Sequence, residues 1–327
     1  MERIQKKSSP DISIIVPFYN EQENIKELYD RLTQVLKKLN LKYELIFIDD
    51  GSTDNTYQLL TEIFLKDKKF KFINLRKNFG QTAALSAGFD LAQGEIIISM
   101  DGDLQHDPAD IPKLLDKMKE GYDIVSGWRK NRVDNLIFRR FPSMVANRIM
   151  KSLSGVNIHD FGTTFKAYKR EVIKDIHLYG ELHRFIPALA SRTGVRITEV
   201  PIKNIVRHKG KSKYGLSRVR RVIFDLLTVK FIISFIDRPL QFFGLIGLGF
   251  GTIGFIIALI LTVGFYFFGL SIIENLGNLI LSIFLMILGV QFIMSGLLAE
   301  VISRVYFKTH NAKIYSIKEV KSHIDET

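Results

Sequence analysis

Cysteine is absent from this chain of 327 residues, and acidic residues are in the minority. Without thiolates the chain forms neither a disulfide nor a Cys-ligated zinc or iron–sulfur site, which excludes a disulfide-stabilised secreted module. The 34 Asp plus Glu against 46 Lys plus Arg give a net charge of +12, and 46% of the residues are hydrophobic. Such a composition is too apolar for a wholly disordered protein. Because the last third is far more apolar than the rest, we expect a soluble part followed by a membrane part.

Charged residues are missing from two long apolar stretches. Residues 242–270 contain none, and residues 279–299 have Gln291 as their one strongly polar side chain. A helix rises about 1.5 Å per residue, so about 20 residues cross the hydrocarbon core of a bilayer. Buried core helices are the alternative, but they are usually shorter and carry a polar face. The sequence therefore predicts two transmembrane helices within residues 241–305.

Basic residues flank these two stretches and are missing between them. The connector 271–278 contains Glu274 and no Lys or Arg. By the positive-inside rule both termini are expected in the cytoplasm, with the connector outside. The first ten residues are polar, and Pro17 interrupts the first apolar run. We therefore expect no signal peptide. The flanking basic residues are Arg218, Arg220, Arg221, Lys230 and Arg238 before the first stretch, and Arg304, Lys308 and Lys313 after the second.

The first two thirds alternate between strand and helix patterns. This alternation predicts an α/β domain with a mostly parallel sheet and helices on both faces. Asn20 is a candidate cap for the first helix, and Asp107 with Pro108 for the fourth. The expected strands are 12–16, 43–48, 70–75, 95–100 and 123–126, and the expected helices are 25–39, 54–64, 82–92 and 108–119.

Polar clusters follow four of the expected strands, at residues 17–21, 49–52, 76–78 and 101–105. Each could be ordinary turn chemistry, since Asp, Asn, Gly and Ser dominate turns for backbone reasons. However, ligands of open parallel sheets bind at the carboxyl ends of the strands. Four clusters in succession therefore predict one binding site along that edge.

The pair Asp101 and Asp103, with the amide of Gln105, supplies oxygen ligands suited to Mg²⁺ or Mn²⁺ that also holds a diphosphate. A calcium EF-hand loop is excluded because His106 stands where glycine is needed and Pro112 where glutamate is needed. An Asp-x-Asp pair by itself is more often a capped turn than a metal site.

Two glycine-containing motifs look like nucleotide-binding signatures. Gly249, Gly251 and Gly254 match a dinucleotide-binding fingerprint, but they lie inside the first apolar stretch, where close packing of helices accounts for them better. Residues 210–212 end like a phosphate-binding P-loop, but Ile205 stands where the first glycine must be. Neither motif supports a nicotinamide or nucleoside-triphosphate enzyme.

Seven short motifs stand in order along nearly the whole chain: Val16-Pro17-Phe18-Tyr19-Asn20-Glu21, Asp49-Asp50-Gly51-Ser52-Thr53-Asp54, Asn78-Phe79-Gly80-Gln81, Asp101-Gly102-Asp103-Leu104-Gln105-His106-Asp107-Pro108, Asp160-Phe161-Gly162, Glu181-Leu182-His183-Arg184-Phe185 and Arg207-His208-Lys209-Gly210-Lys211-Ser212-Lys213-Tyr214. Together they resemble the family 2 inverting glycosyltransferases that load a sugar onto a polyprenyl phosphate. That family includes dolichol-phosphate mannose synthases and bactoprenol glucosyltransferases, whose two C-terminal spans this chain shares.

The resemblance implies a GT-A fold with the nucleotide-sugar at the strand ends. It assigns the metal, Mg²⁺ or Mn²⁺, and the donor diphosphate to Asp101, Asp103 and Gln105, and it makes Asp103 a catalytic residue. Thr163 and Thr164 depart from the family pattern, in which cysteine and a small or apolar residue are expected, and this departure bears on the identity of the sugar. The residues implied to bind the nucleotide-sugar are Pro17, Tyr19, Glu21, Asp50 and Asp101.

Asp160 is the candidate catalytic base, or else it orients the acceptor or a sugar hydroxyl. The attacking group would be a phosphate oxygen of the lipid, which is largely dianionic at neutral pH because the second pKa of a phosphate monoester is near 6. Such a nucleophile needs little help from a base. In-line displacement at the anomeric carbon predicts inversion, with a β-linked product from an α-linked donor.

The acceptor side is predicted from charge. Residues 203–238 contain ten Lys or Arg and two acidic residues. They form either a polybasic collar held by anionic lipid or a clamp for the lipid phosphate, in which hydroxyl and glycine are interleaved with the charges. Residues 216–236 mix apolar and basic side chains, as an interfacial helix does. The predicted clamp residues are Arg207, Lys211, Ser212 and Lys213. Arg129, Arg139 and Arg140 either add to the clamp or serve the solubility of the surface.

We expect transfer of a hexose, with UDP-glucose as the donor and undecaprenyl phosphate as the acceptor, at the cytoplasmic face of the inner (plasma) membrane. GDP-mannose-dependent transfer to a polyprenyl or dolichol phosphate and a non-catalytic nucleotide-binding scaffold are the alternatives, and a homo-oligomer stays open. A processive polysaccharide synthase is disfavoured because the single tryptophan, Trp128, is not part of a Gln-x-x-Arg-Trp motif.

The chain is expected to divide into four parts. These are a catalytic domain (1–210), juxtamembrane helices (211–240), two transmembrane helices (241–305) and a cytoplasmic tail (306–327).

Overall fold

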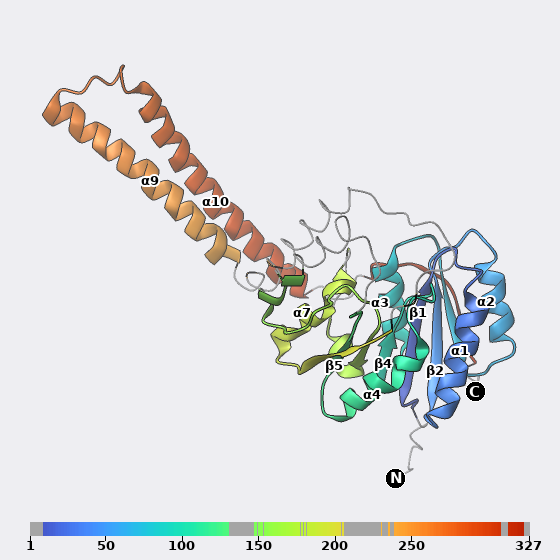
Figure 1. Ribbon diagram of the computed structural model, residues 1–327. Coiled ribbons are helices and arrows are strands. Elements are labelled where there is room, and N and C mark those ends of the chain that lie inside the picture. The colour runs from blue at the N-terminus through green and yellow to red at the C-terminus, as the bar shows by residue number, and fades with distance from the viewer. Residues whose placement is uncertain are drawn as a thin grey trace, which may run out of the picture. The chain divides into compact units, whose positions relative to one another are not determined.

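The chain forms two units in the computed structural model (Figure 1). Unit 1 comprises Met1–Val229 and Lys313–Thr327, and unit 2 comprises Lys230–Ala312. The structure describes residues 9–130, 147–148, 150–152, 154–176, 178, 180, 182–203, 205, 230, 235, 239–308 and 313–323.

The described part of unit 1 is built on an eight-stranded sheet with the strand order β7-β5-β6-β4-β1-β2-β3-β8. Its centre is parallel, because β1 pairs with β2 and β4, and β2 pairs with β3, all in the same direction. β5 and β7 are also parallel to each other, whereas β6 and β8 run antiparallel to their neighbours. The strands are β1 (Ile12–Phe18), β2 (Tyr43–Asp49), β3 (Phe70–Leu75), β4 (Ile96–Ser99), β5 (Ile124–Trp128), β6 (Lys166–Lys169), β7 (Ile197–Pro201) and β8 (Ile317–Lys321).

Helices cover both faces of this sheet. Ile14 and Val16 of β1 belong to a buried cluster that also contains Leu28 and Leu32 of α1. On the other face, Gly88 of α3 lies directly against Ile15. The predicted α/β architecture with a mostly parallel sheet is therefore confirmed. The helices of unit 1 are α1 (Ile25–Lys38), α2 (Thr56–Phe64), α3 (Gln81–Leu91), α4 (Ile111–Lys119), α6 (Arg170–Lys174) and α7 (Ile186–Ala190), with 3-10 turns at Pro108–Asp110, Leu182–Phe185 and Ser191–Thr193.

One of the two predicted helix caps is wrong. α1 begins at Ile25 and Asn24 occupies its cap position, whereas Asn20 has a φ of 55° and its side chain accepts a hydrogen bond from the Thr53 amide. Asn20 thus belongs to a left-handed turn after β1, a conformation that asparagine tolerates better than most residues. The other cap is confirmed, because Asp107 accepts from the Ala109 amide at 3.0 Å and Pro108 opens the turn before α4.

The last described residues return to the sheet as β8, where the sequence pattern predicts only a tail. β8 pairs antiparallel with β3. Two side-chain hydrogen bonds hold it there, from the Tyr57 hydroxyl to Glu319 at 2.8 Å and from the Tyr315 hydroxyl to Asp90. Residues on both sides of unit 2 in the sequence therefore belong to one sheet.

Unit 2 contains two long helices, α9 (Pro239–Phe268) and α10 (Leu276–Lys308). Within them, Pro239–Phe268 and Leu276–Ser303 are long and apolar enough to cross a membrane. The helices pack closely at glycines. A Cβ at Gly289 would lie 2.7 Å from the Gly247 carbonyl oxygen and 2.8 Å from the Gly251 nitrogen, and one at Gly254 would lie 2.6 Å from the Ser282 carbonyl oxygen. This agrees with the interpretation of Gly254 as a packing residue, and the Gly251 backbone lies in the contact with Gly289. For Gly249 the interpretation is wrong, because a Cβ there would meet no described atom within 4 Å.

The glycine contacts predict a difference between two equivalent substitutions. Gly289→Ala places a methyl group against backbone atoms of α9, and overpacking of this kind costs about 1–3 kcal/mol. Gly249→Ala, also within a helix, meets nothing within 4 Å among the described residues and gains helix propensity. Thermal unfolding in detergent should therefore show a lower Tm for Gly289→Ala and an equal or higher Tm for Gly249→Ala. Equal effects of the two substitutions would contradict the packing.

Candidate functional site

The carboxyl ends of the four central strands meet at one edge of the sheet. Their parallel registers pair Phe18 with Asp49, Asp49 with Asn74, and Ile15 with Ser99. The loops that leave these ends therefore begin side by side. This confirms that the polar clusters at residues 17–21, 49–52, 76–78 and 101–105 gather along one edge.

The loops after β1 and β2 bind each other through reciprocal hydrogen bonds. The Asn20 amide donates to Ser52 Oγ at 2.9 Å, and the Thr53 amide donates to Asn20 Oδ1 at 2.8 Å. Beside these contacts, Pro17 is half-buried, Tyr19 is 39% exposed, and Glu21 accepts from the Asn24 side-chain amide at 2.5 Å. Three residues are expected to bind the nucleotide-sugar. Pro17 lies at the end of β1, and Tyr19 and Glu21 lie on the loop that follows it, beside the Asp49-Asp50 turn.

Asp50 holds the start of α3. Its two carboxylate oxygens accept hydrogen bonds from the Phe79 amide at 2.8 Å and the Gly80 amide at 2.9 Å. Gly80 has a φ of 93°, a region that favours glycine. Burial raises the pKa of the Asp50 carboxyl, and the two amide donors oppose that rise. The structure thus assigns Asp50, expected at the nucleotide pocket, a role in shaping the loop between β3 and α3.

The loop after β4 carries Asp101, Asp103 and Gln105, and all three side chains are half-buried. Asp103 Oδ1 accepts from the Gln105 amide at 3.1 Å, which closes a tight turn. Leu104 between them has a φ of 61°, an uncommon conformation that persists only where surrounding contacts fix it. A Cβ at Gly102 would lie 2.6 Å from the Phe18 ring, so glycine allows this loop to lie against the end of β1.

This donor set fits Mg²⁺ or Mn²⁺ bound together with a diphosphate. Two carboxylates and one amide oxygen are hard ligands, and Mg²⁺ usually takes one or two carboxylates plus phosphate oxygens and water. Within the described ranges, no group of three or more His, Cys, Asp or Glu side chains forms a complete metal cage. The protein residues would therefore hold a divalent ion only in combination with the phosphates of a substrate.

Asp101 is held by side chains from two other segments. Its Oδ1 accepts from Gln81 Nε2, at the start of α3, at 2.6 Å and from Thr164 Oγ1, just before β6, also at 2.6 Å. His106 Nδ1 lies 3.8 Å from Asp101 Oδ2. Complete burial lowers the pKa of His106 to about 4, and so the ring is neutral near pH 7. The second departure from the family pattern, Thr164, therefore contacts the predicted metal ligand.

Asp160 forms a bidentate ion pair with Arg129. Arg129 Nε lies 2.7 Å from Asp160 Oδ2 and Nη2 lies 3.0 Å from Oδ1, and the Gly162 amide also donates to Oδ1 at 3.2 Å. The two side chains are 14% and 5% exposed. The structure thus brings together Asp160, the candidate base from the motifs, and Arg129, a candidate clamp residue predicted from charge.

Two buried residues, Lys166 and His183, form hydrogen bonds that the sequence does not predict. Lys166 is fully buried, and its Nζ donates to the carbonyl oxygens of Phe161 and Thr163. His183, also buried, hydrogen-bonds to Thr82 through Nδ1 at 2.6 Å, and burial lowers its pKa well below the usual value. His183 belongs to one of the seven motifs, but the motif does not indicate its role, and Lys166 belongs to none of the motifs.

Other predicted site residues are outside the part of the chain that the structure describes. The predicted interfacial helix at residues 216–236 is also outside it, apart from residues 230 and 235. Of the predicted phosphate clamp only Arg129 is described. The predicted clamp residues outside the described ranges are Arg139, Arg207, Lys211, Ser212 and Lys213.

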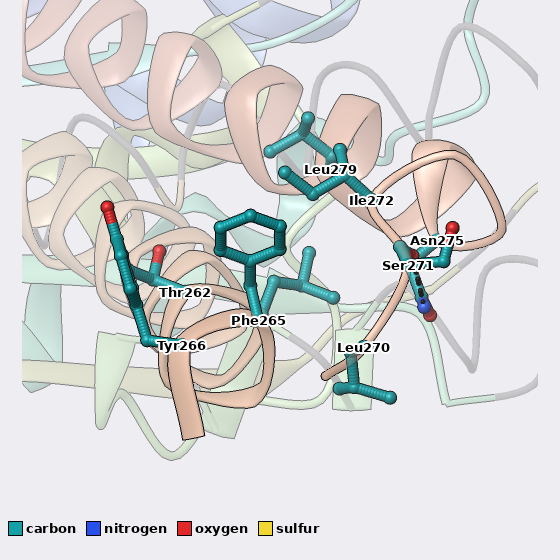
Figure 2. Close-up of a pocket in the computed structure, with 9 residues that line it drawn as sticks. Thr262, Phe265, Tyr266, Leu270, Ser271, Ile272, Asn275 and Leu279 are labelled. Carbon is teal, nitrogen blue, oxygen red and sulfur yellow. Dashed lines mark hydrogen bonds between the residues drawn. The ribbon is translucent and has the colours of Figure 1, made fainter. Parts of the chain in front are cut away.

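Unit 2 contains a cavity near the connector between α9 and α10 (Figure 2). Its lining is mainly apolar, and the side chain of Asn275 is tied to the Ser271 carbonyl oxygen at 3.0 Å. It carries no carboxylate, lysine, arginine or histidine among the described residues that line it, so it lacks the groups that bind a metal diphosphate. The lining residues are Leu261, Thr262, Phe265, Tyr266, Leu270, Ser271, Ile272, Asn275 and Leu279.

The sequence matches one protein-family model and, over nearly its full length, individual known proteins. The model of glycosyl transferase family 2 matches residues 13–177. The dodecaprenyl-phosphate galacturonate synthase of Rhizobium johnstonii is 39% identical over 319 residues, which cover 95% of this chain and 93% of that protein. The undecaprenyl-phosphate 4-deoxy-4-formamido-L-arabinose transferase of Yersinia pestis is 35% identical over 310 residues, covering 94% and 93%.

Solved structures share the fold. The glucosyl-3-phosphoglycerate synthase of Mycobacterium tuberculosis, in complex with Mn²⁺, UDP-glucose and phosphoglyceric acid, aligns with a TM-score of 0.53 and 20% identity. The alignment covers 68% of this chain and 80% of that structure. The same enzyme with phosphoglyceric acid alone aligns with a TM-score of 0.51 and 21% identity, covering 68% and 81%. These likenesses confirm the predicted GT-A fold.

The contacts of Asp50 predict a stability cost for Asp50→Asn. An amide side chain accepts one of the two backbone N–H groups but turns its own NH₂ toward the other, and an unsatisfied buried donor costs about 1–3 kcal/mol. Thermal unfolding should show a lower Tm. The same chemical change in Asp116→Asn, at a side chain that is 68% exposed, should leave the Tm near that of the unmodified protein. An unchanged Tm for Asp50→Asn would contradict this role.

Proposed function

The chain belongs to glycosyl transferase family 2, and we propose that it transfers a sugar from a nucleotide-diphospho-sugar to the phosphate of a polyprenyl phosphate. The names of the two relatives, which match nearly the full length, support the polyprenyl phosphate acceptor. The observation that carries the proposal is the meeting of the Asp101-x-Asp103 loop, the Asp50 turn and the Arg129–Asp160 pair in one sheet domain. In this proposal, these polar groups together bind two substrates that each carry phosphate, the nucleotide-sugar donor and the lipid acceptor.

The donor half of the proposed site is formed by the strand-end loops. Asp101, Asp103 and Gln105 would hold Mg²⁺ or Mn²⁺ together with the donor diphosphate. The ion would offset the negative charge that grows on the departing nucleoside diphosphate. The Mn²⁺ in the structurally similar synthase is consistent with such an ion. The residues proposed to line the nucleotide-sugar pocket are Pro17, Tyr19, Glu21, Asp50 and Asp101.

The acceptor half would use Arg129 to bind the lipid phosphate. A phosphate oxygen attacks the anomeric carbon, a new C–O bond forms, and the bond from that carbon to the diphosphate breaks, so that the electron pair leaves with the nucleoside diphosphate. One in-line step inverts the configuration. The bidentate pair with Arg129 favours orientation over base catalysis as the role of Asp160, because its two carboxylate oxygens already accept from a guanidinium.

The donor sugar is the finer part of the proposal. The sequence-based expectation is UDP-glucose, with GDP-mannose as the alternative. The relatives' names point instead to galacturonate and to 4-deoxy-4-formamido-L-arabinose. A test must therefore include an acidic and a neutral sugar, with more than one nucleotide base.

We further propose a multi-pass inner (plasma) membrane protein whose catalytic domain and termini are cytoplasmic. α9 and α10 are apolar enough to span, and two crossings return the chain to the side on which it started. The pairing of β8 with β3 supports this proposal, because residues before α9 and after α10 share one sheet. The proposed clamp for the lipid phosphate adds Arg139, Arg207, Lys211, Ser212 and Lys213 to Arg129.

The activity can be tested with purified full-length protein and undecaprenyl phosphate. The donors are UDP-glucose, UDP-galacturonate and GDP-mannose, each with Mg²⁺ or Mn²⁺, and mass spectrometry detects the glycosylated lipid. We expect product from one donor, none in EDTA, and recovery when the ion is restored. Asp103→Asn should lower turnover about 100-fold or more, since it removes a charge that would face the ion.

Asp116→Asn, the same change on the surface of α4, should retain full turnover. Full activity in EDTA would exclude the metal role of Asp101 and Asp103. A lack of product with every donor, in protein that unfolds cooperatively, would exclude the proposed transfer for these sugars.

The membrane orientation can be tested by cysteine labelling in whole cells, because the chain has no native cysteine. Glu274→Cys in the connector and Lys318→Cys on β8 both replace exposed residues. An impermeant thiol reagent should label the first in intact cells and the second only after permeabilisation. The reverse pattern would overturn the cytoplasmic location of the sheet domain.

A further inference from the structure

One short segment, residues 160–166, contacts both halves of the proposed site. At its start, Asp160 forms the bidentate pair with Arg129. Near its end, Thr164 donates to Asp101 at 2.6 Å. The segment leads directly into β6, so its last residue is fixed in the sheet.

The sheet register explains why Thr164 reaches Asp101. β4 and β6 pair antiparallel with Ser99 opposite Lys166, and continuing the pairing by two residues brings 101 and 164 together. The Ser99 hydroxyl also donates to the Thr164 carbonyl oxygen at 2.6 Å, which holds the backbone at this point. Thr164 itself is 6% exposed, so its hydroxyl bond to Asp101 is formed away from bulk water.

Two donors converge on the same oxygen of Asp101. Thr164 Oγ1 and Gln81 Nε2 both lie 2.6 Å from Oδ1. Fixing one oxygen of a carboxylate from two directions sets the rotation of the whole group. Groups that orient a metal ligand in this way tune the affinity for the ion even though they do not touch it.

Lys166 holds the backbone between the two ends. It is fully buried, and within the described ranges its Nζ has no carboxylate partner in an ion pair, only the carbonyl oxygens of Phe161 and Thr163. Burial lowers the pKa of this amine to about 7. Burying a lysine without an ion pair costs folding free energy, so a compensating role is expected for Lys166. Bridging two carbonyl groups of one loop supplies that role.

We propose that residues 160–166 act as one positioning unit, in which Thr164 orients Asp101 for the donor, Asp160 orients Arg129 for the acceptor, and Lys166 fixes the backbone between them. The assignment of Asp101 to the donor and of Arg129 to the acceptor rests on the proposed function. None of the three needs to touch a substrate, so they are positioning residues. The unit sets the distance between the two anionic substrates through a single short piece of chain.

The donor end is tested by the pair Thr164→Val and Thr164→Ser. Valine keeps the shape but removes the hydroxyl, whereas serine keeps the hydroxyl. Isothermal titration of the full chain in detergent micelles with UDP or GDP, in the presence of Mn²⁺, measures binding without turnover. We expect Thr164→Val to weaken Mn²⁺–nucleotide binding about 10-fold or more, the size typical of groups that orient a metal ligand. Thr164→Ser should bind within about 2-fold of the unmodified protein.

A matched control is Thr33→Val, which also removes a buried hydroxyl. Thr33 Oγ1 donates to the Tyr29 and Asp30 carbonyl oxygens within α1, at 2.9 and 3.0 Å. Its Mn²⁺–nucleotide affinity should equal that of the unmodified protein. Equal losses in Thr33→Val and Thr164→Val would mean that the effect is a general loss of stability, and this would overturn the proposal.

The acceptor end is tested by Asp160→Asn, which breaks the charged pair with Arg129. It should raise the apparent KM for undecaprenyl phosphate and leave Mn²⁺–nucleotide affinity unchanged. Thr164→Val should weaken Mn²⁺–nucleotide binding and leave the apparent KM for undecaprenyl phosphate unchanged. Lys166→Met should weaken both. If Lys166→Met fails to fold, the opposite signatures of Thr164→Val and Asp160→Asn still decide the question.

The outcomes separate this inference from the proposed function. If the unmodified protein binds neither UDP nor GDP with Mn²⁺, the proposed function fails for both nucleotides, and the positioning unit fails with it. If the unmodified protein binds one of them and Thr164→Val binds it equally well, the positioning unit alone is overturned.

Discussion

The parallel pairing of β1 with β2 and β4 is the constraint on which the rest of the site depends. All of Ile12–Val16 is buried, as expected for a central strand covered on both faces. In a parallel sheet the strands end at the same edge, so the loops after Phe18, Asp49 and Ser99 start as neighbours. A slip of one residue would turn every side chain of β1 to the opposite face. The apolar packing of the strand centres therefore fixes the register of the polar strand ends.

From this edge, a chain of hydrogen bonds crosses the site. Asp50 holds the amides of Phe79 and Gly80, which sets the backbone just before α3. α3 then begins with Gln81, whose side chain reaches Asp101. Thr164, two residues before β6 begins, donates to the same carboxylate oxygen. Gln81 of α3 and Thr164, just before β6, thus hold Asp101 directly, and Asp50, just after β2, holds it indirectly through the start of α3. Pre-organisation of this kind reduces the cost of assembling a site when substrate binds.

The sheet, the site edge and the apolar helices could be predicted from sequence because each depends on a local pattern. Strand and helix periodicity located β1 to β5 and α1 to α4 within a few residues, and the polar clusters located the strand ends. The contacts of Thr164 and Lys166 required the antiparallel pairing of β6 with β4, which no local pattern reveals. β8 was missed for the same reason, since its partner β3 is far away in the sequence. The Asn20 cap failed because asparagine suits a left-handed turn as well as a helix start.

The Asp160–Arg129 pair reduces an electrostatic repulsion that the proposed transfer between two anionic substrates would otherwise meet. A carboxylate near a dianionic phosphate would repel it, by about 1 kcal/mol per charge pair at 4 Å in water and about 4 kcal/mol where the effective dielectric constant is near 20. A dianionic phosphate does not need a base to remove a proton, so an isolated carboxylate would bring repulsion without a chemical benefit. Pairing with Arg129 cancels that charge and fixes the guanidinium in a defined plane. In the proposed transfer, the carboxylate would serve the acceptor through the arginine that it orients. This is the arrangement expected when the chemistry depends on bringing two anions together and not on proton transfer.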